Sequence, residues 1–152
     1  MKRIFISLLL CTVFIIQAHA QSTNKIYDSV LAKKLKADDY GMKNYILVLL
    51  KSGSNTSTDK ALKDSLFAGH MKNISRLAEK GSLVVAGPFG NNDKYLGLFV
   101  LNASSFDEVK KMLETDPAIN NKFLEPELYM WYGSAALQET FDIHNKIQKL
   151  SF

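Results

Sequence analysis

The sequence predicts an α+β protein with a β-α-β-β-α-β core, in which a four-stranded antiparallel sheet carries both helices on one face. Short apolar runs rich in strand formers alternate with longer segments whose apolar residues have helical spacing, and they follow each other in this order. The 152-residue chain is 47% hydrophobic and 22% charged, which is typical of a globular protein and not of a disordered one.

The first twenty residues have the three parts of an export signal. Lys2 and Arg3 are positive, residues 4–16 are apolar, and residues 18–20 (Ala-His-Ala) form a small-x-small cleavage site. We therefore expect a signal peptide over 1–20, cleaved after Ala20, and a periplasmic or secreted protein. The apolar run is shorter than the roughly 20 residues that span a bilayer, so no stable membrane anchor is expected.

Cys11, the only cysteine, lies within this segment. A lipid anchor at Cys11 is the alternative, although the bulky Leu10 stands where lipid-attachment sites have a small residue. Removing residues 1–20 leaves 132 of the 152 residues and no cysteine, which excludes disulfides and thiol catalysis. Because Lys2 and Arg3 also leave and no acidic residue does, the formal charge falls from +4 to +2. This weak positive charge does not indicate a nucleic-acid partner.

The mature chain divides into an N-terminal extension (21–41), a core domain (42–137) and a C-terminal helix (138–152). In the extension, an amphipathic helix is predicted over 23–39 from the spacing of Tyr27, Val30, Leu31 and Leu35. The first core strand, 44–50, is apolar at nearly every position. A polar loop leads to a helix over 59–80, which ends at Gly81.

The second half of the core begins with a strand over 83–86, which Gly87 and Pro88 are expected to stop. A turn at 91–93 precedes a strand over 95–101. Ser105 and Glu108 form a capping box that starts the next helix, and Pro117 ends that helix at Asp116. A strand over 128–132 completes the ferredoxin-like order.

The strands predict a second covered surface. A sheet with helices on one face should show alternating polar residues on the other, yet strands 44–50 and 95–101 are almost wholly apolar. The simplest cover is the same sheet of a second copy, which predicts a two-fold homodimer with sheets face to face. The alternative is that one of the terminal helices covers this face.

His70 and Asp116 are the predicted site residues. His70 falls between Leu66 and Ile74 on an apolar stripe, and Asp116 lies three residues after Leu113 on another. A buried carboxylate needs a partner, so we expect a His70–Asp116 hydrogen bond. It would orient the imidazole and fix its tautomer, leaving the second nitrogen for acid–base work. The structural alternative is a polar tie between two helices, and the residues alone favour it.

Other features point less clearly to a site. Gly87, Pro88, Phe89 and Trp131 are predicted to line a pocket, although a turn and a buried strand explain them equally well. His144 continues the C-terminal stripe and is expected to be a packing residue. No zinc-binding spacing, phosphate-binding glycine loop or G-x-S-x-G motif is present, so we expect neither metal nor organic cofactor.

Five short motifs occur in a specific order: GHM (69–71), LAEKG (77–81), VVAGPF (84–89), TDP (115–117) and WYG (131–133). In this order they resemble the YciI-like, or YCII-related, proteins over residues 43–137. The resemblance implies a dimeric α/β barrel and an active-site pair of a helix histidine and an aspartate before proline, which correspond to His70 and Asp116. It favours a functional role for the pair.

The family includes a dehydrochlorinase that acts on a chlorinated hydroxyquinol, and its superfamily includes muconolactone isomerases. The resemblance therefore implies a cofactor-independent isomerase or lyase that acts on a small cyclic or aromatic compound. A non-catalytic module that binds a small ligand is the alternative, and a purely structural dimer is the third reading. The export signal and the two terminal helices depart from the compact members of the family.

Overall fold

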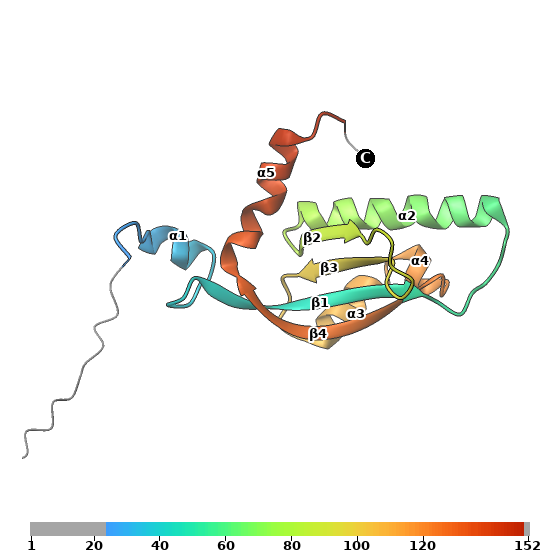
Figure 1. Cartoon of the computed structure of the whole chain (residues 1–152), viewed down its shortest axis with the longest axis horizontal. Helices are drawn as coiled ribbons and strands as arrows, with labels where there is room; N and C mark the ends of the chain where they lie inside the picture. Colours follow the sequence, from blue (N-terminus) through green and yellow to red (C-terminus); the bar gives the residue numbers. More distant parts are fainter. Residues whose placement is uncertain (1–23, 151–152) are drawn as a thin grey trace, which may run out of the picture.

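The computed structural model describes residues 24–150 and contains the expected four-stranded sheet. Its strands β1 (Met42–Ser52), β2 (Leu83–Pro88), β3 (Gly97–Leu101) and β4 (Leu124–Ser134) lie in the order β2-β3-β1-β4, and all neighbours are antiparallel. The crossovers run through α2 (Lys60–Glu79) and α3 (Phe106–Leu113), which confirms the ferredoxin-like prediction (Figure 1). The predicted signal peptide, with Cys11, lies outside the described residues. Within 24–150, no helix has the length and apolarity needed to cross a membrane.

The main core lies between the sheet and the helices. Alternate residues of the central strand β1, Ile46, Val48 and Leu50, face the helices and are almost fully buried. They belong to one cluster with residues of β3, α2 and α3: Phe99, Leu101, Leu77, Val109 and Leu113. The helical periodicity in the sequence therefore located the core-facing side of both helices.

The opposite face of the sheet is also apolar, as predicted. Tyr45, Val84 and Val100 form a second buried cluster there. Leu137 of the 3₁₀-helix η1 (Ala135–Glu139) packs against it, so the C-terminal segment covers part of this face. The remainder is open, and Trp131 of β4, which pairs with Tyr45, is 37% exposed. Intramolecular cover is therefore only partial.

The terminal segments differ from their predictions. Helix α1 (Ser29–Lys34) has six residues instead of the predicted 17, because the chain turns at Leu35 and Lys36 takes a φ of 53°. Of its predicted apolar face only Leu35 is buried, and Val30 is 79% exposed. The C-terminal segment is η1 followed by α5 (Thr140–Ile147), not one helix, and the predicted boundary at 137/138 falls inside η1.

The edge strands are longer than predicted. Strand β2 continues through Gly87 and Pro88, which were expected to stop it, and Pro88 pairs with Gly97. Strand β4 starts at Leu124 and includes Pro126. Both strands lie at edges of the sheet, where a proline without an N–H is tolerated because one side has no strand neighbour.

Gly53 lets the end of β1 pass close to the backbone that leads into β4. A Cβ on Gly53 would lie 2.0 Å from the Lys122 carbonyl oxygen, and the Gly53 N–H donates to the Phe123 carbonyl at 2.9 Å. We expect Gly53→Ala to lower the free energy of unfolding by about 2–3 kcal/mol in urea denaturation, because rigid backbone must move and a hydrogen bond weakens. Gly90→Ala is the control, since a Cβ there meets nothing within 4 Å. Equal losses in the two variants would contradict the close approach.

Candidate functional site: a buried histidine–aspartate pair

His70 and Asp116 meet between α2 and the short helix α4 (Pro117–Asn120). Nδ1 of His70 lies 2.7 Å from Oδ2 of Asp116, which confirms the predicted hydrogen bond. His70 is 7% exposed and Asp116 is fully buried. Because a carboxylate oxygen accepts, Nδ1 is the donor, and Nε2 is left for other partners.

Local sequence explains why these two residues meet. Helix α3 ends at Leu113, and Asp116 adopts an extended conformation that caps α4, where Pro117 occupies the first turn. Asp116 therefore starts a helix, and the prediction that it ends one was wrong. A Cβ on Gly69 would lie 2.7 Å from Cγ of Pro117, so glycine allows α2 and α4 to approach closely. This close approach places the adjacent residues His70 and Asp116 side by side.

Both carboxylate oxygens of Asp116 have hydrogen-bond donors. Oδ1 accepts from the backbone N–H groups of Ala118 (3.0 Å) and Ile119 (3.3 Å). Oδ2 accepts from His70 and, at 3.3 Å, from Nδ2 of Asn73. Four donors compensate for the loss of hydration of a buried carboxylate and fix its position relative to the imidazole.

Asn73 was not predicted as part of the site. Its side-chain oxygen accepts from Arg76 (2.6 Å) and from the Thr115 hydroxyl (2.9 Å), which fixes the orientation of its amide. Arg76 also donates to Thr115 at 2.7 Å. The signal was present in the sequence, because Asn73 lies three residues after His70 and four before the core residue Leu77, on the same apolar stripe.

Aromatic rings enclose the imidazole of His70. Its ring stacks on Phe99, with centroids 5.7 Å apart and planes at 27°, and Phe67 approaches edge-on at 5.9 Å. Nε2 has no hydrogen-bond partner within residues 24–150, whereas every buried side-chain nitrogen and oxygen in that range has one. Nε2 therefore touches solvent, and it is the atom of the pair that a small molecule can reach.

The structure does not bring the other predicted site residues to His70. Trp131 lies on the sheet face opposite to the one that carries Phe99 and His70. Gly87 and Pro88 end β2, and the ring of Phe89 lies 6.4 Å from that of Tyr95. Their predicted role in lining a pocket with the pair has no contact in this structure to support it.

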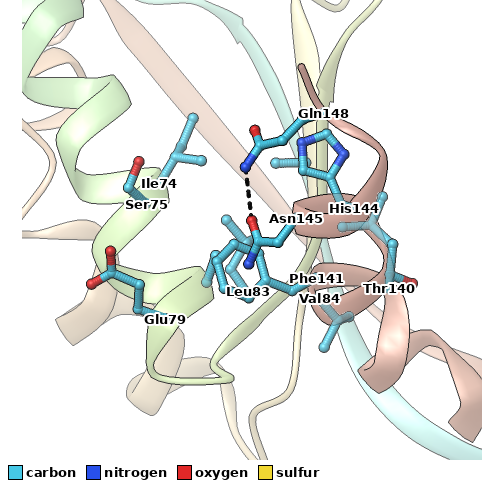
Figure 2. Close-up of a pocket in the computed structure, with 13 residues that line it drawn as sticks. Ile74, Ser75, Glu79, Leu83, Val84, Thr140, Phe141, His144, Asn145 and Gln148 are labelled. Carbon is cyan, nitrogen blue, oxygen red and sulfur yellow. Dashed lines mark hydrogen bonds between the residues drawn. The ribbon is translucent and has the colours of Figure 1, made fainter. Parts of the chain in front are cut away.

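His144 is exposed and does not pack into the core, contrary to prediction. It lines a cavity of about 430 Å³ between α2, β2 and α5 (Figure 2). The packing role on the C-terminal stripe belongs instead to Phe141, which contacts the main core. Within residues 24–150, no three His, Cys, Asp or Glu side chains are grouped so as to hold a metal ion.

Fold and site together define a small α+β domain with an oriented histidine beside a fully buried aspartate. The YCII-related domain family matches residues 45–130, a range that includes both members of the pair. The chain belongs to the YCII-related domain family.

A solved structure is also similar to this chain. It is the 5-chloro-2-hydroxyhydroquinone dehydrochlorinase from Burkholderia phenoliruptrix AC1100, in complex with 2,5-dihydroxybenzoquinone. The similarity covers 57% of this chain and 92% of that chain, with 22% sequence identity and a TM-score of 0.39. None of the curated proteins matches this chain.

Proposed function

We propose that this protein is an acid–base enzyme that uses His70 and Asp116 on a small cyclic or aromatic compound, in an isomerase, lyase or dehydrochlorinase type of reaction. The observation that carries the proposal is the buried pair with one imidazole nitrogen left at the surface. Nε2 of His70 would take or give the proton, and Asp116 would hold the ring and its tautomer. Such a proton transfer needs neither metal nor organic cofactor.

Nuclear magnetic resonance in D₂O tests this proposal. The protein is incubated with a panel of hydroxylated ring compounds that includes 2,5-dihydroxybenzoquinone, the compound bound in the dehydrochlorinase structure. Deuterium incorporation or product formation that depends on the protein supports catalysis. Saturable binding without either outcome would favour the alternative, a non-catalytic ligand-binding module. No binding by any compound would leave the pair as a structural tie.

We also propose that the protein is a homodimer with the open sheet faces in contact. The supporting observation is the apolar surface that η1 leaves uncovered, where Leu47, Leu49 and Leu98 are half-buried and Trp131 is exposed. Glu127 is the acidic residue that pairs with Leu49 on this face. It accepts from Lys51 (3.0 Å), Tyr95 (3.0 Å) and Tyr129 (3.1 Å).

These hydrogen bonds, above all that from Lys51, lower the pKa of Glu127. Its charge is therefore already paired within one chain, which is what a covered face requires.

Sedimentation velocity at micromolar concentration is expected to show a dimer. Leu49→Lys should give a monomer, because it would place an unpaired charge in the interface. Leu62→Lys on α2, whose leucine is 38% exposed, is the control and should remain dimeric. A wild-type monomer under these conditions would contradict the dimer.

We further propose that the protein is exported, on the basis of the sequence of residues 1–20. The protein recovered outside the cytoplasm should begin at Gln21. Retention in membranes that Cys11→Ser abolishes would instead show the lipid anchor.

A further inference from the structure

A cavity of about 430 Å³ lies away from His70, between the C-terminal half of α2, the edge strand β2 and helix α5. Figure 2 shows Ser75 and Glu79 of α2 on one side and Thr140, His144 and Gln148 on the other, with Leu83 between them. Helix α5 begins at Thr140, outside residues 45–130, so the chain builds one wall of this cavity from a segment beyond the family match.

The walls have the composition of a small-molecule site. The lining is mainly apolar, with Ile74, Ala78, Val84 and Phe141, and a few polar groups stand at the rim. Its volume falls within the range of about 300–1,000 Å³ that is usual for ligand pockets. Edge strand β2 has no strand neighbour on its outer side within residues 24–150, so backbone groups there are available to a ligand.

The charge of the lining identifies the kind of ligand. Glu79 is the one charged carboxylate in it, neither Lys nor Arg lines the cavity, and Glu79 has no ion-pair partner within residues 24–150. The amide of Gln148 donates to Asn145 at 3.0 Å, so the rim amides are already partly ordered (Figure 2). An apolar floor with one unpaired negative charge at its rim suits an amphipathic cation.

We propose that this cavity is a second ligand site, which takes a small molecule with an apolar ring or chain and an amine near Glu79. The site is independent of the His70–Asp116 pair. Its ligand would contact α2, β2 and α5 and would hold α5 against the sheet.

Chemical-shift mapping of the ¹⁵N-labelled protein tests the site, with tryptamine as the probe and indole-3-propionate as an anion of similar size. At about pH 8 an alkyl amine is charged and an imidazole is ordinarily neutral. We expect tryptamine to shift amide signals of α2, β2 and α5 and to bind more tightly than the anion. Glu79→Gln should weaken tryptamine binding about twofold to fivefold, which is the size of an exposed ion pair.

Ser75→Trp fills the cavity from an exposed position and should weaken binding by more than tenfold. Met71→Trp, one turn earlier on α2 and outside the lining, is the matched control and should bind as the wild type does. If Ser75→Trp does not fold, Asn145→Trp fills the cavity from the opposite wall. Unchanged binding in the filled variant, shifts outside these elements, or equal affinity for the two probes would overturn the proposal. Shift changes at the cavity on dilution without probe would assign it to a second copy instead and would also overturn it.

Discussion

Replacing Asp116 by alanine is expected to lower the free energy of unfolding by about 3–5 kcal/mol, which is large for a single side chain. The carboxylate is fully buried and accepts from four donors, which lie on His70, Asn73, Ala118 and Ile119. Alanine leaves these donors without an acceptor in a space that admits little water. It also removes the cap of α4, which holds Pro117 against Gly69.

Urea denaturation followed by circular dichroism measures this loss. Asp28→Ala is the matched control, since Asp28 also caps a helix through two backbone N–H groups but is exposed, and it should cost about 1 kcal/mol or less. Asp116→Asn should lie between them, because its amide oxygen can keep the cap while its amide nitrogen faces donors. A loss for Asp116→Ala no larger than that for Asp28→Ala would show that the carboxylate does not organise the core.

The fold was predictable because each core element carries a local signal. Alternate burial on β1 and the apolar stripe of α2 have the periods of a strand and a helix, and these periods survive in the sequence. The ends of elements were predicted less well, since they depend on tertiary neighbours. Pro88 stops a strand only where a ladder partner needs its N–H, and its place at a sheet edge cannot be read from the residue itself.

The site was predictable in part for the same reason. His70 was found because a histidine interrupted an apolar stripe, and Asp116 because a carboxylate continued another. Asn73 obeys the same rule and was missed. The cavity beside α5 could not be predicted, because it depends on how far the helix stands from α2 and β2, and that distance has no sequence period.

Replacing His70 by asparagine is expected to abolish turnover while keeping most of the structure. The amide nitrogen of asparagine occupies nearly the place of Nδ1, so it can still donate to Asp116, whereas nothing replaces Nε2. If Nε2 transfers the proton, the rate constant for turnover of a compound found by the D₂O screen should fall about 10²–10⁴-fold. The lost ring contacts with Phe99 and Phe67 should lower the free energy of unfolding by only about 1–3 kcal/mol.

The comparison that decides the role of the pair is His70→Asn against His144→Asn, the same substitution at an exposed histidine away from the pair. A structural tie requires the donor at Nδ1, which His70→Asn keeps, so it predicts near-normal turnover in both variants. An acid–base role requires Nε2, which His70→Asn removes, so it predicts a loss in that variant alone. Ligand affinity separates the remaining possibility, because a pure binding site would lose affinity in His70→Asn without any turnover to lose. The two nitrogens of one ring thus answer different questions, and this variant changes only one of them.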